Sequence, residues 1–317
     1  MTARILLLGA TGTIGRAVLR TLQRRGHDVV ALVRAEPADD LGVPLLKSKL
    51  DDADDLSRLI ETAAPFDVVL SCMASRSGVA ADAWAVDYQA HMNMLQAAER
   101  AEIGHFILLS SICVQRPLLA FQQAKLAFEN ALRASGLRYS IIRPTAYYKS
   151  LSGQVGRVQA GKPFLLFGNG ELTACKPISG NDLADYIADC ISDQSRHDRI
   201  LPIGGPEKAI TPKQQGEMLF AMLQKPPRFR HVPLALFDIM GGALSLAALL
   251  SRHAAAKAEL ARIGRYYASE SMLWLDPETG RYDAEATPST GRETLVDHYA
   301  RMIAGDIQVE RGDHALF

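Results

Sequence analysis

A glycine-rich turn near the amino terminus, with Gly9, Gly12 and Gly15, limits the folds open to this chain. An apolar run, Arg4–Leu8, precedes the turn, and a helical pattern follows it as far as Arg25. Glycine at these positions permits a tight exit from a strand, close approach of backbone amides to a ligand and close packing of the helix. The partial positive charge of a helix N-terminus favours an anion. The sequence therefore predicts a strand–turn–helix unit that binds phosphate.

Apolar strand patterns alternate with helical patterns through the first half of the chain. The predicted strands are Arg4–Leu8, Asp28–Val33, Leu45–Lys49, Asp67–Ser71, Phe106–Ser110 and Tyr139–Arg143. The predicted helices between them are Ile14–Arg25, Leu56–Ala63, Trp84–Ala101 and Gln122–Ala134. Six strands with crossover helices predict an α/β fold built on a doubly wound parallel sheet, a Rossmann-like NAD(P)-binding domain.

The pattern changes after about residue 150 to helices separated by loops rich in Gly and Pro. We therefore expect a nucleotide-binding domain at residues 1–150 and a smaller, mainly helical substrate-binding region at residues 151–317. One further apolar run, Arg199–Ile203, is expected to return a strand to the sheet.

Composition excludes some classes of partner and location. Among 317 residues, Lys and Arg together number 35 and so do Asp and Glu, so no basic excess favours nucleic acid. The cysteines have neither metal-ligand spacing nor a CxxC motif, so we expect no metal and a reducing compartment. Because the first strand begins so close to Met1, the sequence predicts a cytoplasmic protein without a targeting peptide. It does not indicate an oligomeric state.

An apolar stretch at Val232–Leu250 is interrupted by Pro233, Asp238 and the pair Gly241-Gly242. These residues make it a poor membrane-spanning helix. A buried core helix, a lid over an apolar ligand and a surface that contacts a membrane all stay open as interpretations.

Arg34 ends the second predicted strand, where an acidic residue would accept hydrogen bonds from the ribose hydroxyls of NAD. Arginine there offers a planar fork to the additional phosphate of NADP, so the sequence predicts NADPH as cofactor. Arg16, on the first turn of the helix, either adds a second positive charge or is a solvated surface residue. Since ligands bind at the carboxyl ends of parallel strands, that rule also nominates Asp51, residues 72–75, Ser111 and residues 144–149.

The first half of the chain resembles the short-chain dehydrogenase/reductase superfamily, whose Tyr-x-x-x-Lys motif lies on the helix after the fifth strand. Here the motif is Phe121-Gln122-Gln123-Ala124-Lys125, so the lysine matches and the proton-donating tyrosine is absent. The resemblance implies that Lys125, treated as an exposed side chain, binds the nicotinamide ribose, that Ser111 occupies the position of the catalytic serine, and that Pro144 backs the nicotinamide. The missing tyrosine and the GxxGxxG turn are typical of the atypical, NmrA-like branch.

Four further segments carry a closer resemblance. They are residues 143–151 (RPTAYYKSL), 174–179 (ACKPIS), 201–206 (LPIGGP) and 264–273 (GRYYASESML). With these segments the chain resembles the divinyl chlorophyllide a 8-vinyl-reductase family over essentially its whole length. The resemblance implies NADPH-dependent reduction of the 8-vinyl group of divinyl (proto)chlorophyllide a to ethyl, a step of chlorophyll or bacteriochlorophyll synthesis. It also implies a tetrapyrrole substrate, a phototrophic organism, expected to be a bacterium, and a peripheral contact with the photosynthetic membrane.

Reduction of a vinyl group conjugated to a macrocycle needs no acid beside a carbonyl oxygen, so Phe121 suits this chemistry and offers a flat face to the pigment. The proton source stays open among Tyr147, Tyr148, Lys149, Cys175 and ordered water, and Lys149 or Lys176 is a candidate partner for the pigment's propionate. The expected catalytic residues are Lys125, Tyr147 and Ser111. The expected substrate-binding residues are Phe121, Tyr147, Tyr148, Lys149 and Cys175. The expected cofactor-binding residues are Gly9, Thr11, Gly12, Thr13, Ile14, Gly15, Arg34, Asp51, Ala74, Lys125 and Pro144.

Two other interpretations share the fold. A nucleotide-sensing regulator of the NmrA type binds NADP without turnover, and a reductase of the isoflavone or phenylcoumaran type acts on smaller phenolic substrates. The four matching segments favour the pigment reductase over both.

Overall fold

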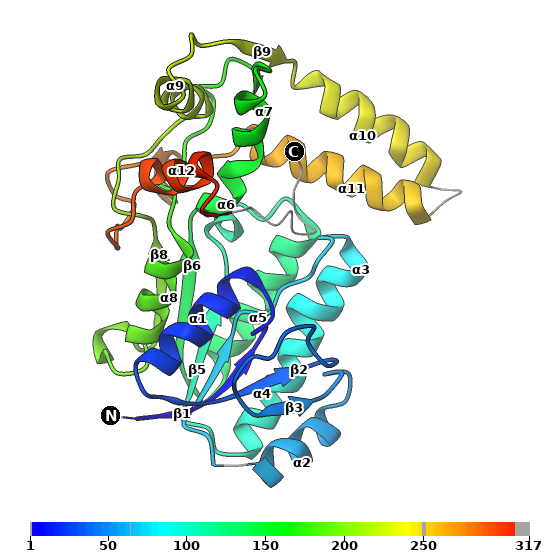
Figure 1. The fold of residues 1–317 in the computed structure, drawn as a ribbon. Helices are drawn as coiled ribbons and strands as arrows, with labels where there is room; N and C mark the ends of the chain where they lie inside the picture. The colour runs from blue at the N-terminus through cyan, green and yellow to red at the C-terminus, as the bar shows by residue number, and fades with distance from the viewer. Residues whose placement is uncertain (1, 64, 249–251, 308–317) are drawn as a thin grey trace. The chain divides into compact units, whose positions relative to one another are not determined.

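Seven strands form one sheet in the order β3-β2-β1-β4-β5-β6-β8 (Figure 1). The structure is a computed structural model that describes residues 2–63, 65–248 and 252–307. The strand bounds are β1 Arg4–Leu8, β2 Asp28–Val33, β3 Leu45–Lys47, β4 Val68–Ser71, β5 His105–Leu109, β6 Arg138–Pro144 and β8 Arg199–Ile203. The registers from β3 across to β6 are all parallel. Since β2 and β4 flank β1 on opposite sides, the sheet is doubly wound, which confirms the predicted fold class.

Burial on both faces explains why the central strands are almost entirely apolar. Every residue of β4 and β5 is buried, and so are Ile5 to Leu8 of β1. Alternate residues point to opposite faces of a strand, and Leu6 and Leu8 pack in a core cluster with Met94 and Phe128 from the covering helices.

Helices cover the two faces of this sheet (Figure 1). The helix α1 packs against α8, and α4 packs between α2 and α5. Their bounds are α1 Thr13–Arg24, α2 Ala53–Ala63, α4 His91–Arg100, α5 Ala120–Ala134 and α8 Gly180–Asp189. Short helical turns are α3 Ala80–Ala83, η2 Ile112–Gln115 and η4 Gln194–Arg196.

The helix predicted at Trp84–Ala101 is wrong in one respect. Its first part is a π-helical segment, η1, at Trp84–Ala90, and regular α-helix begins only at His91. A π-helix has wider turns than an α-helix and is frequent at functional sites. The period used to predict the helix does not detect such a change.

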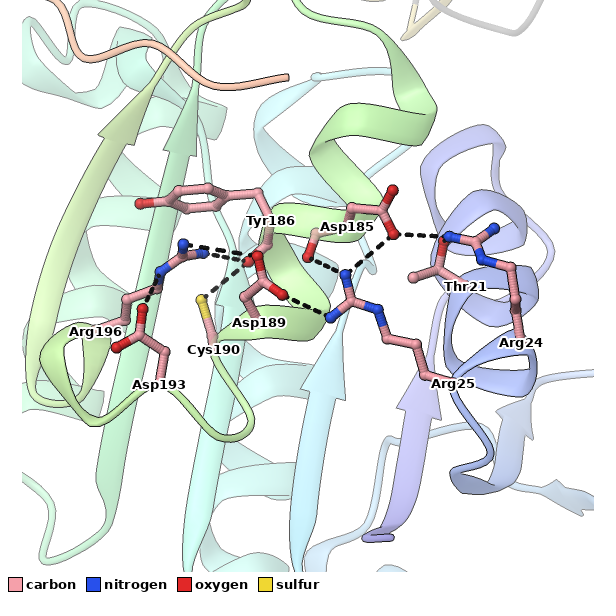
Figure 2. Close-up of polar contacts among 9 residues, drawn as sticks. All are labelled: Thr21, Arg24, Arg25, Asp185, Tyr186, Asp189, Cys190, Asp193 and Arg196. Atoms are coloured by element: carbon pink, nitrogen blue, oxygen red, sulfur yellow. Dashed lines mark hydrogen bonds and ion pairs between the residues drawn. The ribbon is translucent and has the colours of Figure 1, made fainter. Parts of the chain in front are cut away.

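Charged side chains join α1 to α8 although the two helices are about 160 residues apart in sequence (Figure 2). Arg24 contacts Asp185 at 2.7 Å, and Arg25 contacts Asp189 at 2.6 Å. On the other side of α8, Arg196 donates to the Tyr186 carbonyl at 2.8 Å. The Arg24 and Arg25 contacts attach residues 180–202 to the nucleotide-binding domain, and the Arg196 contact lies within that segment.

The chain divides into two compact units. Unit 1 comprises Met1–Ser75, Ala80–Pro144 and Gly180–Pro202, and unit 2 comprises Arg76–Val79, Thr145–Ser179 and Ile203–Phe317. The predicted boundary at residue 150 therefore needs a correction: residues 180–202 belong with the first domain because α8 packs on α1 and β8 extends the sheet.

Unit 2 is mainly helical, with short strand pairs. Its elements are α6 Tyr148–Leu151, η3 Ser152–Gln154, α7 Val155–Gln159, β7 Phe164–Phe167, α9 Pro212–Met222, β9 Phe229–Val232, α10 Ala235–Ala248, α11 Arg252–Tyr267, β10 Trp274–Leu275, β11 Tyr282–Asp283 and α12 Leu295–Ala304. Parallel pairing joins β7 to β9, and a buried cluster that includes Tyr148, Phe164 and Tyr299 forms the core.

The apolar stretch predicted at Val232–Leu250 begins as the end of β9 and continues as α10, which lies beside α11 (Figure 1). Residues 249 and 250 of that stretch lie outside the described residues. Among the helices described, none is long and apolar enough to cross a membrane.

Buried His105 yields a prediction for stability. The Ser140 hydroxyl donates to the Arg196 carbonyl at 2.8 Å, so His105 Nε2–H donates to Ser140 Oγ at 3.0 Å. Burial, followed by repulsion from His197 and Arg138, lowers the pKa of His105 to about 3. The unfolded chain therefore takes up a proton near pH 6.5 while the folded protein does not, and stability falls as the pH drops from about 6.5 towards 3.

We expect His105→Gln to remove part of this pH dependence. The variant should be less stable at pH 7.5, but the difference from the parent should shrink on acidification by up to about 1.4 kcal/mol per pH unit. Urea denaturation at pH 7.5, 6 and 5 measures this difference, with His231→Gln as an exposed control. Parallel curves for parent and His105→Gln would contradict the assignment.

Candidate cofactor and substrate site

The glycine turn between β1 and α1 is shaped by contacts that only glycine permits. Gly9 has a φ of +76°, and a Cβ there would lie 2.7 Å from the backbone of Cys72 and Met73. A Cβ on Gly15 would lie 2.0 Å from the Gly9 carbonyl oxygen. The exit of β1, the loop after β4 and the start of α1 are therefore packed backbone against backbone.

Gly12 differs, because its nearest neighbour would be in ordinary contact with an added Cβ, 3.4 Å from the Gly9 carbonyl oxygen. Packing within the protein therefore does not require glycine at this position. A glycine that the protein's own packing does not require is what we expect where a ligand approaches the backbone closely. Gly12 is also the N-cap of α1, with no side-chain cap and no acidic residue in the first turn. Thr11, Thr13 and Ile14 surround this helix end. The site therefore fits an anion such as the diphosphate of a dinucleotide.

Arg34 follows β2 directly and is exposed, and within the described chain it forms no hydrogen bond or ion pair. Arg16 is more constrained: its Nε donates to the Thr11 carbonyl at 3.2 Å and its guanidinium contacts Asp39 at 3.0 Å. Of these two arginines, Arg34 is the one that remains available to a phosphate beside β2.

Asp51 and Ala74 are both exposed and follow β3 and β4. The backbone before Asp51 is fixed, because Asn93 Nδ2 donates to the Leu50 carbonyl at 2.7 Å. Ala74 lies in the loop that touches Gly9. Both positions are at the carboxyl end of the sheet, where a ligand of this fold binds.

Lys125 is not an exposed lysine. Its Nζ lies 2.9 Å from Asp87 Oδ1, and the two side chains are 12% and 0% exposed. The Ser75 backbone N–H donates to the same oxygen at 3.2 Å. Burial raises the pKa of Asp87, but attraction to Lys125 and the hydrogen bonds from Ser75 and Lys125 outweigh it, so the pKa is lowered and the carboxylate is ionised. Lys125→Met would leave that charge buried and unpaired, so this change should lower stability.

His91 connects the same elements through neutral hydrogen bonds. Burial, followed by repulsion from Lys125, lowers the pKa of His91 to about 4. Its Nδ1 must donate to the Val86 carbonyl, at 2.9 Å, so its Nε2 accepts from Ser71 Oγ at 2.8 Å. Ser71 Oγ in turn accepts from the Met73 N–H. This relay holds the loop after β4 against η1.

The end of β5 carries two serines with different partners. Ser110 donates to buried Glu129, which also binds Arg143 through both carboxylate oxygens. Ser111 immediately precedes η2, and its hydroxyl lies 3.1 Å from Cys113 Sγ. The predicted serine, Ser111, is thus held less tightly than its neighbour.

Phe121, Lys125, Ser111 and Pro144 are all placed in unit 1. Phe121 lies in the first turn of α5, half-buried, and Pro144 is the last residue of β6 and is buried. The structure brings Lys125 together with Asp87 and Ser75. The sequence analysis did not predict that Asp87 would be the partner of Lys125. The one sequence signal was a charged residue, Asp87, inside an apolar helical pattern.

The remaining candidates lie in unit 2. Tyr148 is 2% exposed, and its hydroxyl donates to the Glu293 carbonyl at 2.5 Å. Burial raises the pKa of the Cys175 thiol to about 12. These surroundings favour packing for Tyr148 and make Cys175 a weak acid. Tyr147 and Lys149 are half-buried, at the start of α6.

The four segments that carry the family resemblance meet around residues 174–178 in unit 2. Thr145 Oγ1 donates to the Lys176 carbonyl, and the Gly205 N–H donates to that same carbonyl at 3.1 Å. The Met272 N–H donates to the Ala174 carbonyl at 2.9 Å. Lys176 Nζ donates to the Thr287 carbonyl at 3.1 Å. These segments are therefore parts of one framework, and Lys176 has a structural partner within it.

No group of His, Cys, Asp and Glu side chains in the described chain is arranged to hold a metal ion.

Comparisons with known proteins agree with this geometry. An NAD(P)H-binding family matches residues 9–194. The chain is 47% identical to the chloroplastic divinyl chlorophyllide a 8-vinyl-reductase of Oryza sativa subsp. indica, over 99% of this chain and 82% of the relative. It is 46% identical to the enzyme of the same name from Arabidopsis thaliana, over 94% of this chain and 76% of the relative. Among solved structures, an NADPH-dependent quinone oxidoreductase from Escherichia coli, complexed with NADPH, matches with a TM-score of 0.69 and 20% identity, over 94% of this chain and 99% of the other.

Arg34 allows a direct test of cofactor choice. Arg34→Asp should raise the dissociation constant for NADPH by about 10- to 100-fold and leave that for NADH nearly unchanged, because one charge-assisted hydrogen-bond pair is lost. Fluorescence titration with both cofactors measures the effect, with Arg20→Asp, an exposed arginine of α1, as control. Equal weakening for NADPH and NADH would show that Arg34 maintains structure instead.

Proposed function

The chain belongs to the divinyl chlorophyllide a 8-vinyl-reductase family, and from that membership we propose that it reduces the 8-vinyl group of divinyl chlorophyllide a to ethyl with NADPH. The observation that carries this function is 47% identity over 99% of the chain to a named vinyl reductase. The NAD(P)H-binding match over residues 9–194 supports the cofactor. The substrate is accordingly a tetrapyrrole.

NADPH, when bound, supplies a hydride. The turn from Gly9 to Gly15 and the start of α1 bind its diphosphate, and Arg34 binds the additional phosphate that distinguishes it from NADH. Lys125 binds the nicotinamide ribose. Because Asp87 neutralises Lys125 inside the protein, the ammonium group stays in a fixed place without an energetic penalty from an unpaired charge.

Phe121 has no proton to give, and this reaction does not need one at that position. A hydride added to the outer vinyl carbon leaves negative charge that the conjugated macrocycle delocalises, and one proton on the neighbouring carbon completes the ethyl group. No oxyanion forms next to Phe121, so an acid there would stabilise nothing. The phenyl ring instead supplies an apolar face for a flat pigment.

Tyr147 is our proposed proton donor. Tyr148 is buried with its hydroxyl donating to a carbonyl, and the thiol of Cys175 has a pKa near 12, so each is less suited to give a proton. The backbone of Tyr147 is held by a parallel bridge to Ile178. Lys149, two residues later, is our proposed partner for the propionate.

An isotope experiment tests the reaction. With purified protein, divinyl chlorophyllide a and NADPH deuterated at the transferred position, the product should gain two hydrogens, one of them deuterium on the new ethyl group. Mass spectrometry and the absorption shift of the pigment report both. Deuterium found only in solvent, or no reduction of the pigment, would overturn the proposal.

Phe121→Tyr separates this mechanism from carbonyl reduction. Restoring the superfamily tyrosine should not accelerate vinyl reduction, and should slow it because a hydroxyl is placed against an apolar ring. Steady-state kinetics on the pigment and on simple ketones provide the measurement. A large rate gain together with ketone reduction would return the protein to the carbonyl-reducing class.

We further propose that α10 contacts an anionic lipid surface. Leu236, Ile239 and Met240 are 45%, 68% and 46% exposed, and their spacing places them on one side of the helix. Exposed apolar side chains grouped in this way mark an interaction surface.

Charge identifies the partner. Residues 228–267 contain six basic and two acidic residues in a chain of zero net charge. Both acidic residues are paired, Asp238 with Arg265 at 3.1 Å and Glu259 with Arg262 at 3.0 Å. An apolar face beside a basic excess fits the interface of an anionic bilayer, which is also where an amphipathic pigment partitions.

Co-sedimentation with vesicles tests this contact. The protein should bind phosphatidylcholine vesicles that contain phosphatidylglycerol, and bind less at high salt or to phosphatidylcholine alone. Ile239→Glu should reduce binding by about tenfold, whereas Val296→Glu, at an exposed valine of α12, should not. Equal binding by both variants would contradict the contact.

A further inference from the structure

Asp87 is buried, and its contact with Lys125 uses only one of its two carboxylate oxygens. The residue is 1% exposed, and both of its interactions, with Lys125 and with the Ser75 N–H, use Oδ1. Its second oxygen, Oδ2, is also buried and has no hydrogen-bond donor in the described chain. A buried, unsatisfied carboxylate oxygen is costly, so a native structure retains one where a ligand or water satisfies it.

A second unsatisfied atom lies nearby on α5. Gln122 precedes Lys125 by three residues, which places both on one side of the helix. Its Oε1 accepts from the Leu119 N–H, while its buried Nε2 has no acceptor in the described chain. The two elements that hold the ion pair, η1 and α5, therefore carry one buried acceptor and one buried donor without partners.

A hydroxyl group both donates and accepts, so a vicinal diol matches this pair of atoms together with the ammonium group. The nicotinamide ribose assigned to Lys125 has such a diol. The π-helical form of η1, which places Asp87, is typical of functional sites.

We propose that Asp87 binds the nicotinamide ribose jointly with Lys125: Oδ1 fixes the Lys125 ammonium group, and Oδ2 accepts a hydrogen bond from a ribose hydroxyl. This inference rests on the proposed function in taking NADPH as the cofactor and Lys125 as a ligand of its nicotinamide ribose. It makes Asp87 a cofactor-binding residue, where pairing with Lys125 alone would make it a structural one.

Two ligands distinguish these roles. NADPH contains the nicotinamide ribose, whereas 2′,5′-ADP contains only the adenosine end and its phosphates. Asp87→Asn should raise the dissociation constant for NADPH by about 10- to 100-fold, because a hydrogen bond to a charged group is lost. The dissociation constant for 2′,5′-ADP should change by less than about twofold. Calorimetric titration measures both.

Ser140→Ala serves as the matched control, since it removes a buried hydrogen bond with His105 near the start of β5 and β6. It should lower the melting temperature without changing either dissociation constant. Equal weakening of both ligands by Asp87→Asn, or weakening of neither, would overturn the inference.

A double variant guards against loss of folding. Asp87→Asn alone leaves Lys125 buried without a counter-charge, so we expect a lower melting temperature. Asp87→Asn combined with Lys125→Met removes both charges and should recover much of that stability, while NADPH binds more weakly than to Lys125→Met alone. Recovery of NADPH affinity together with stability would show a purely structural role and overturn the inference. Failure of the parent protein to bind NADPH would overturn the proposed function as well.

Discussion

The close approach of three backbone segments at Gly9 is the constraint on which the nucleotide-binding unit depends. The exit of β1 lies against the loop after β4, and the first turn of α1 lies against the exit of β1, at distances that exclude any Cβ at Gly9 or Gly15. Because these contacts involve backbone atoms, no side-chain rearrangement can relieve a substitution. The same packing points the start of α1 at the carboxyl end of the sheet, where a diphosphate binds.

Buried charge is the second constraint, and in unit 1 two buried carboxylates each form an ion pair with a cationic side chain. Asp87 with Lys125 and Glu129 with Arg143 each place a fully buried carboxylate against a cation. Loss of one partner from such a pair costs about 3–5 kcal/mol, a large fraction of the unfolding free energy of a typical domain. Both pairs involve α5, the helix that carries Phe121 and Lys125. The ion pairs therefore fix the orientation of the helix on which the proposed chemistry relies.

In unit 2, backbone hydrogen bonds make the corresponding framework. Residues 174–178 accept hydrogen bonds from Thr145, Gly205 and Met272, which lie in three other segments of the chain. Tyr148, one of the proposed pigment contacts on sequence grounds, belongs to this framework, since its N–H donates to the Ile178 carbonyl.

Sequence alone determined the fold class, the glycine turn, the positions of the strands along the chain and the preference for NADPH, because each depends on local spacing. Strand bounds were correct to within two residues, since the apolar period records burial directly. The π-helical segment, the attachment of residues 180–202 to unit 1 and the Lys125–Asp87 pair were decided only by the tertiary structure. Local sequence records which side of an element is apolar. It does not record which distant side chain a buried charge will meet, and that meeting turned a lysine expected at the surface into half of a buried ion pair.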